Sequence, residues 1–222
     1  MQNSDFKEQS LTKKRRKFLI RRIIFFLCLI IALILFMNFM LSLLVKEDSY
    51  RGIYKKSISE RELKEMEKSL NIREVKYNWA EGLKEGNMPK RLIIHHSATE
   101  NEESPEEIHK FHLEKGWSGI GYHFYIRKDG TIYRGRDENF IGSHAKTANY
   151  NTLGICLEGN FEKEGLKEEQ KKSLINLGFY LSLKYPIKDI LPHRDVVDTL
   201  CPGSLFPLET IKNEIINYIK YF

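Results

Sequence analysis

The longest apolar stretch in the chain is Ile23–Val45, a run of 23 residues without a charged side chain. At about 1.5 Å per residue, a helix of this length spans the roughly 30 Å hydrocarbon core of a bilayer. A cleaved signal peptide is the alternative, but its apolar region usually covers only about 7–15 residues and ends at a site of the A-x-A type. Residues 41–45 offer no such site. The pattern therefore favours an uncleaved transmembrane helix.

The segment after this stretch, residues 46–88, is rich in Lys and Glu and has few large apolar clusters. Ser59 and Glu62 have the spacing of a helix capping box, which predicts a helix from about Glu60 to Leu70. A charged segment of this kind favours a stalk that separates the apolar stretch from the rest of the chain.

Apolar runs typical of a folded domain begin at about Pro89. They predict strands at Arg91–His95, His123–Arg127, Thr131–Arg134 and Leu153–Leu157. Asp129-Gly130 is a hairpin turn signal between the second and third of these strands.

Three segments after residue 103 have the apolar period of a helix. Ser104-Pro105-Glu106-Glu107 is a strong helix start, and this helix is expected to stop near Gly116 with Ile108 and Phe111 facing inward. The other two helices, with the apolar residues of their inner faces, are Leu166–Tyr185 with Leu174, Leu177 and Leu181, and Leu208–Tyr221 with Ile211, Ile215 and Tyr218. Together these elements predict an α/β domain over residues 89–222, a small mixed central sheet flanked by helices, preceded by one transmembrane helix.

The net charge of +6 comes from one end of the chain. Residues 1–22 contain eight Lys or Arg and two acidic residues, whereas the rest of the chain contains 28 of each sign. The basic charge is thus located in a tail and not on a binding face, and nucleic acid is not expected as a partner. A basic tail before an apolar span, with only Lys46 close behind it, is predicted to stay in the cytoplasm. The remainder from Lys46 onwards would then lie outside the cell membrane.

All seven histidines lie between positions 95 and 193. His95 ends the first predicted strand, His193 follows Leu191-Pro192 in a predicted loop, and Cys201 stands eight residues later. A catalytic zinc site takes three protein ligands from His, Cys or carboxylate side chains and leaves a fourth position for water. These three residues meet that requirement. Spacing alone leaves other interpretations open: each histidine can be an ordinary core or surface residue, and Cys201 a free thiol or half of a disulfide with Cys156.

Six short motifs follow one another from residue 94 onwards. They are Ile94-His95-His96-Ser97-Ala98-Thr99, Gly121-Tyr122-His123-Phe124, Asp129-Gly130-Thr131-Ile132-Tyr133-Arg134-Gly135-Arg136, Gly142-Ser143-His144-Ala145, Asn151-Thr152-Leu153-Gly154-Ile155, and His193-x7-Cys201-Pro202. In this order they closely resemble the zinc-dependent N-acetylmuramoyl-L-alanine amidases of the phage-lysozyme and peptidoglycan-recognition-protein type (amidase type 2). The resemblance covers about Pro89 to Phe222, and six motifs in order are far more specific than any one of them.

The resemblance implies zinc as the cofactor, with His95, His193 and Cys201 as its ligands and His96 as a non-ligand. It places the family's catalytic tyrosine on Tyr122. A second polar residue of the site falls on Thr199, where some members have lysine. Cys156 matches a buried strand position, and an oxidised Cys201 would not bind zinc in the way that the family requires; both points argue against the disulfide.

The implied function is hydrolysis of the amide bond between N-acetylmuramic acid and the L-alanine of the stem peptide in bacterial peptidoglycan, by zinc-activated water. His144 matches a histidine that lines the substrate cleft, and Trp117, Arg136 and Asn151 are further candidates for binding a glycan–peptide strand. We expect a monomer that acts from the outer face of the cytoplasmic membrane.

Two other classes of function remain as alternatives. Members of the recognition family that lack the cysteine ligand bind wall fragments without cutting them, but this chain has Cys201 and Tyr122. A cysteine hydrolase with Cys201 as the nucleophile is the other alternative, and sensitivity to a chelator distinguishes it from a zinc enzyme.

Overall fold

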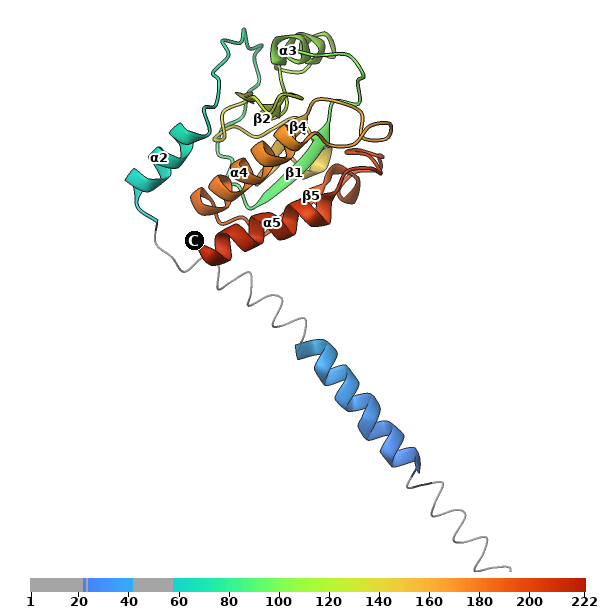
Figure 1. The fold of residues 1–222 in the computed structure, drawn as a ribbon. Helices are drawn as coiled ribbons and strands as arrows, with labels where there is room; N and C mark the ends of the chain where they lie inside the picture. Colours follow the sequence, from blue (N-terminus) through green and yellow to red (C-terminus); the bar gives the residue numbers. More distant parts are fainter. Residues whose placement is uncertain (1–21, 23, 42–57) are drawn as a thin grey trace, which may run out of the picture. The chain divides into compact units, whose positions relative to one another are not determined.

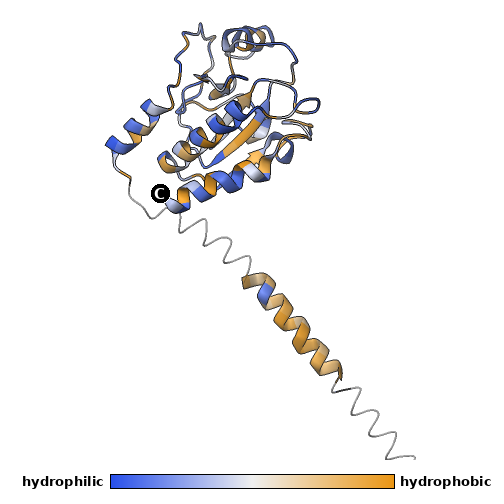
Figure 2. Cartoon of the chain, in the orientation of Figure 1, coloured by the Kyte–Doolittle hydropathy of each residue, from blue (hydrophilic) through white to orange (hydrophobic). Residues whose placement is uncertain are grey.

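The computed structural model describes Arg22, residues 24–41 and residues 58–222, and these fall into two compact units that are described separately. In the first unit, Ile24–Leu41 is a helix that is long and apolar enough to cross a membrane, by length and composition. Figure 2 shows it apolar along nearly its whole length. The tail at residues 1–21 and the remaining positions of the predicted span lie outside the described residues.

In the second unit, five strands form one mixed sheet in the order β3-β2-β4-β1-β5 (Figure 1). The strands are β1 (Arg91–His96), β2 (Phe124–Ile126), β3 (Ile132–Arg134), β4 (Thr152–Leu157) and β5 (Asp189–Pro192). β1 pairs in parallel with β4 and β5, and β2 pairs in parallel with β4. Only β3 is antiparallel, in the predicted hairpin with β2. The predicted fold class is confirmed.

The sequence did not predict β5, which was expected to be loop. The strand has only four residues and ends on Pro192, so its apolar pattern is too short to identify it. A proline is tolerated here because β5 is the edge strand of the sheet, beside β1. The consequence for function is large, since β5 leads directly into His193.

One face of the sheet, which we call the helix face, packs against α4 (Glu168–Lys184) and α5 (Leu208–Tyr221) (Figure 1). The apolar cluster there includes Leu92 and Ile94 of β1, together with the predicted inner-face leucines of α4 and Ile211 and Ile215 of α5. Tyr218 was predicted to face inward as well, but 54% of it is exposed. Near its C-terminal end, α5 instead packs Ile219 against the core.

The opposite face, which we call the site face, carries α3 (Pro105–Glu114) and a much smaller apolar cluster of Ile108, Ile120, Tyr125 and Cys156. Ser104 caps α3 at the predicted helix start, and it forms a capping box with Glu107. Phe111 was expected to face inward but is 52% exposed. The buried positions of α3 are instead Pro105, Ile108, His109 and His112, so histidines fill the inner face of this helix.

Residues 58–88 pack against the domain, and they are the described part of the segment 46–88 that was predicted to be a stalk; residues 46–57 lie outside the described residues. α2 (Glu60–Ser69) has the predicted capping box, and it packs Leu63, Met66 and Leu70 against the helix-face cluster. Further along, the backbone N–H of Arg73 donates to Ile132, and Tyr77 and Trp79 pack on the site-face cluster. Most of the large apolar residues of this segment therefore contact the domain.

Candidate active site

His95 is placed by the alternation of side chains along β1. Leu92 and Ile94 point to the helix face, so His95 points to the site face, where it lies in register with Cys156 of β4. Its side chain is almost completely buried, with 1% exposed. The neighbouring His96 points the other way. Its Nδ1 accepts a hydrogen bond from the backbone of Phe161, 3.1 Å away, so this ring nitrogen is engaged by the protein itself.

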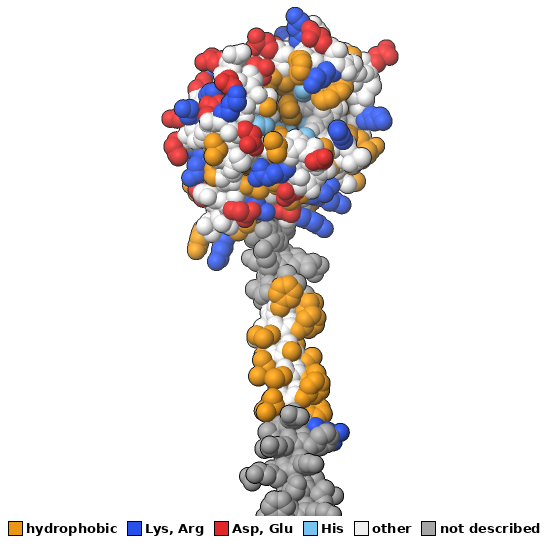
Figure 3. All heavy atoms as spheres, turned by 90° about the vertical axis from the view of Figure 1, so that its right-hand side faces the viewer, with side chains coloured by type: hydrophobic (Ala, Val, Ile, Leu, Met, Phe, Trp, Pro, Cys, Tyr) orange, Lys and Arg blue, Asp and Glu red, His pale blue; other side chains and the backbone are white. Residues whose placement is uncertain are grey.

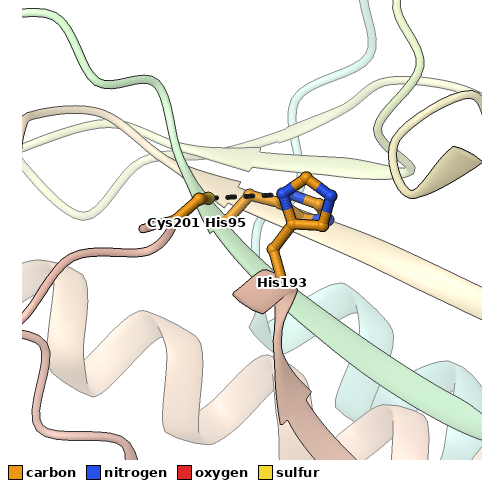
Figure 4. Close-up of side chains that lie close together, drawn as sticks. All are labelled: His95, His193 and Cys201. Atoms are coloured by element: carbon orange, nitrogen blue, oxygen red, sulfur yellow. Dashed lines mark hydrogen bonds between the residues drawn. The ribbon is translucent and has the colours of Figure 1, made fainter. Parts of the chain in front are cut away.

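His193 reaches His95 because β5 runs parallel to β1. Ile94 pairs with Pro192, so the residue after each of them lies at the same edge of the sheet. The rings of His95 and His193 are 4.3 Å apart, centre to centre. Figure 4 shows the His193 ring beside His95, on the chain that leaves β5.

The loop after His193 brings Cys201 back to the same edge of the sheet. The backbone N–H of Arg194 donates to the carbonyl of Cys201 at 2.9 Å. The Cys201 Sγ accepts the backbone N–H of His96 at 3.4 Å and lies 3.9 Å from Nδ1 of His95 (Figure 4). A chain of backbone contacts thus holds the sulfur against the end of β1.

The three predicted ligand residues form a group suited to a metal ion. Their ligand atoms all lie within 4.8 Å of one another. Nε2 of His193 is buried and has no hydrogen-bond partner among the described residues, which is an unfavourable state for a ring nitrogen unless a ligand or water satisfies it. Two imidazoles and one thiol are a donor set that zinc accepts readily. The residues present therefore fit the metal.

The protonation states of the group agree with this fit. Burial, followed by the neighbouring His193, His96 and His123, holds the pKa of His95 well below its ordinary value. Burial also lowers the pKa of His193. Both imidazoles are therefore neutral, which is the form that binds metals. Burial raises the pKa of the Cys201 thiol to about 11, and a coordinated cation reverses this effect by deprotonating the thiol outright.

Tyr122 lies beside the three residues, with its ring centre 5.2 Å from that of His95. Burial raises the pKa of its hydroxyl well above the usual value, and Cys156 and Cys201 add to that shift. The hydroxyl therefore keeps its proton and is able to donate it in a hydrogen bond. Thr199 is half-buried in the loop before Cys201, and its Oγ1 accepts the Cys201 backbone N–H at 3.3 Å. That bond leaves the hydroxyl proton of Thr199 available.

Of the four predicted substrate residues, Trp117 is the one with an exposed side chain close to Tyr122. It is 40% exposed, and its ring lies 4.6 Å from that of His112, which in turn lies 5.5 Å from Tyr122. His112 is a site residue that the sequence reading missed. Its spacing of three from His109 on a predicted helix was the only available signal. Figure 3 shows histidine atoms within a hollow on one face of this unit, with apolar side chains at its margin.

Arg136 and Asn151 are located differently from the prediction. The Arg136 guanidinium is 3% exposed and donates to the carbonyls of Ile120 and Ile141, so it ties loops together beneath the surface. Asn151 has a left-handed φ of 57° and turns the chain into β4. It stands at the N-terminal end of β4, whereas His95 pairs near the C-terminal end. Neither position presents a side chain beside the three ligand residues.

His144 was predicted to line the substrate cleft, but it lies behind His95, with 8% of the residue exposed. Its Nδ1 is 3.0 Å from Nε2 of His95, on the side of the ring away from Cys201. Burial, followed by His95 and His123, holds the pKa of His144 well below its ordinary value. His144 is therefore a neutral neighbour of a predicted ligand.

This chain is similar to several known proteins. A family model described as N-acetylmuramoyl-L-alanine amidase matches residues 85–204. The endolysin of Enterobacteria phage T3 is 37% identical over 132 residues, which are 56% of this chain and 87% of the phage protein. The structure of the N-acetylmuramoyl-L-alanine amidase LysC from Clostridium intestinale URNW is 50% identical, covering 65% of this chain and 96% of that one with a TM-score of 0.64. Drosophila PGRP-LB is 32% identical, covering 60% and 89% with a TM-score of 0.54.

The fold, the site and these matches define a peptidoglycan hydrolase. The chain belongs to the N-acetylmuramoyl-L-alanine amidase family, because the family model matches more than half of it. The predicted enzyme class is confirmed: the reaction is hydrolysis of the amide bond between N-acetylmuramic acid and the L-alanine of the stem peptide.

Proposed function

We propose that this amidase works with one zinc ion held by His95, His193 and Cys201. The observation that supports it is the convergence of these three side chains, from β1, the start of η2 (His193–Asp195) and the loop after it, to within 4.8 Å of one another. When bound there, zinc would supply a Lewis acid that polarises the scissile carbonyl and lowers the pKa of water to about 7.

The protein's own groups would stabilise the charge that develops on the amide oxygen. Attack on an amide carbonyl makes a tetrahedral oxyanion, which preorganised donors stabilise by about 3–4 kcal/mol each. Tyr122 keeps its proton and stands beside His95, so we assign it as the main donor. Thr199 is the second donor, with a smaller contribution because its hydroxyl is neutral where some members of the family have a lysine.

Substrate binding is proposed along the hollow that contains the histidines. Trp117 has an exposed aromatic face and is connected to Tyr122 through the ring of His112, which contacts both. Such a face suits stacking against the apolar side of a sugar. His144, Arg136 and Asn151 are not proposed as substrate contacts. His144 and Arg136 are buried and hydrogen-bonded within the protein, and Asn151 stands at the N-terminal end of β4.

A membrane anchor is the second part of the proposal. The helix Ile24–Leu41 has the length and composition of a span, and residues 1–22 carry the basic excess that stays in the cytoplasm. We therefore propose residues 1–22 as a cytoplasmic tail, 23–45 as an anchor, and the remainder as an extracytoplasmic monomer that cuts nearby peptidoglycan. In this division, residues 46–57 are the connection and 58–88 belong with the amidase domain of 89–222.

The chemical part is tested on the full chain in detergent with purified peptidoglycan. New N-terminal alanine should form, should stop when a chelator removes the metal, and should return when zinc is added back. New alanine ends that persist in the chelator, but disappear on alkylation of Cys201, would instead indicate a cysteine hydrolase.

The topology is tested in cells. Protease added to spheroplasts should remove the amidase domain and leave a membrane-bound fragment that contains residues 1–22. Recovery of a soluble chain whose N-terminus lies after residue 41 would show that the helix is a cleaved signal and not an anchor.

A further inference from the structure

A row of hydrogen-bonding groups runs behind His95, away from the three ligand atoms. Nε2 of His95 is 3.0 Å from Nδ1 of His144. Nε2 of His144 is 3.4 Å from Oγ1 of Thr152, the first residue of β4. The Thr152 hydroxyl is in turn 3.0 Å from the carbonyl oxygen of Ala148 and 2.9 Å from that of Asn149. All three side chains of the row are buried.

The position of one proton determines the others in this row. Carbonyl oxygens only accept, and both lie closer to the Thr152 hydroxyl than the His144 ring does, so we assign the hydroxyl proton to Ala148 or Asn149, and Thr152 accepts from His144. The proton of neutral His144 therefore sits on Nε2, and its Nδ1 is an acceptor. His95 must then donate from Nε2. This leaves Nδ1 of His95, the nitrogen 3.9 Å from the Cys201 sulfur, without a proton and with its lone pair free.

We propose that Thr152 and His144 are positioning residues that fix the tautomer of His95, so that its Nδ1 is ready to coordinate the metal. This rests on the proposed zinc site. Groups that hold the second nitrogen of a ligand histidine typically change metal affinity by about 10–100-fold when they are removed. The usual holder is a carboxylate or a backbone carbonyl. Here the neutral imidazole of His144 accepts from His95, and the hydroxyl of Thr152 determines which nitrogen of His144 carries the proton.

The surroundings of His144 hold its ring in the orientation that the row requires. A Cβ added at Gly142 would lie 2.4 Å from the His144 ring, and one added at Gly154 would lie 2.5 Å from it. The ring thus occupies a slot that exists because both positions are glycine. The Asn149 side chain accepts the backbone N–H groups of His144 and Ala145 at 2.9 and 2.8 Å, which fixes the chain that carries the ring.

The row is tested by pairs of substitutions on the full chain. Thr152→Val removes the hydroxyl and keeps the shape, whereas Thr152→Ser keeps a hydroxyl. His144→Ala removes the acceptor, whereas His144→Asn offers an amide oxygen close to the position of Nδ1. Thr147→Val, at an exposed threonine of the same loop, is the matched control. Zinc dissociation constants are measured by competition with a chelator, and thermal unfolding of each metal-free variant checks the fold.

We expect Thr152→Val to weaken zinc binding about 10-fold and His144→Ala up to about 100-fold, with Thr152→Ser, His144→Asn and the control staying within a few-fold of wild type. The second readout needs no metal. Ring-nitrogen NMR of the metal-free wild type should show His95 protonated at Nε2, and Thr152→Val should shift it towards Nδ1. A metal-free His95 protonated at Nδ1, or equal zinc affinity in all folded variants, would contradict the proposed positioning role of Thr152 and His144. A wild type that binds no zinc would instead overturn the proposed cofactor.

Discussion

The two faces of the central sheet are built from the same strands and hold different chemistry. On the helix face, α4 and α5 close over a dry cluster of aliphatic and aromatic side chains that includes Leu92 and Ile94. On the site face, the adjacent positions of the strands carry His95, Tyr125 and Cys156, with further histidines packed above them. Residues for stability and residues for reactivity are therefore neighbours along each strand, because successive side chains of a strand alternate between faces.

Substitution of the adjacent histidines of β1 should show the largest difference between the two faces. His95→Ala should remove zinc and lower amidase activity by at least about 10³-fold, since a Lewis acid contributes several kcal/mol to such a reaction. His96→Asn keeps an acceptor for the Phe161 backbone, so it should cost only about 1 kcal/mol of stability and leave activity within a few-fold. Activity is measured as alanine ends released per folded molecule. Inactive but folded His96→Asn would contradict the division between the faces.

Two tyrosines separate reactivity from packing within the site face itself. Tyr122→Phe should lower kcat by about 10²–10³-fold, because it removes an oxyanion donor. Tyr125→Phe is the matched change, because the Tyr125 hydroxyl donates to the Glu103 carbonyl at 3.1 Å and so has a structural role. In this variant kcat should stay unchanged, while about 1 kcal/mol of stability is lost. Steady-state kinetics of both variants check the assignment, and equal kcat for the two would remove Tyr122 from the mechanism.

A large-to-small change on the helix face should lower stability and leave kcat unchanged. Leu177 of α4 is completely buried, so Leu177→Ala should lower the free energy of unfolding by about 2–5 kcal/mol through lost burial and a cavity. Leu205→Ala, at a residue 52% exposed, should change it by less than about 0.5 kcal/mol. Denaturant unfolding gives both values. Since neither residue contacts the site, kcat per folded molecule should stay the same in both.

The last expected effect is an acid sensitivity that arises from buried histidines of the site face. Burial is the main cause that lowers the pKa values of His112 and His123 to about 4. In the unfolded chain these groups titrate near 6.5. As pH falls from about 6.5 towards 4, the unfolded state takes up protons that the folded state does not, so stability present above pH 6.5 is progressively lost.

Denaturant midpoints of the metal-free chain between pH 7 and 5 should show this loss, while most carboxylates stay ionised. His112→Asn keeps an acceptor for the Gly121 backbone N–H, which His112 Nδ1 now accepts at 3.1 Å, and should flatten the slope. An unchanged slope in a stable His112→Asn variant would show that His112 is not a source of the acid sensitivity.

Much of this molecule follows from local sequence patterns. The capping box at Ser59 and the helix start at Ser104 were predicted because a few residues of fixed spacing define them. The helix α5 was predicted with the bounds that the structure shows. The inward direction of Phe111 was wrong because helical period alone does not reveal which neighbour covers a helix. For α3, the covered stripe is formed by histidines, which count as polar in any apolar pattern.

The class of the fold, the family and the three candidate metal ligands could be predicted from the sequence, because ordered motifs at fixed spacing carry that information. The packing of residues 58–88 on the domain, the support of loops by Arg136 and the position of His144 behind His95 became visible only in the folded protein. These roles depend on which groups meet across the sheet. His95, His144 and Thr152 come from separate segments, and a proton can be assigned along them only once parallel pairing has brought β1 and β4 together.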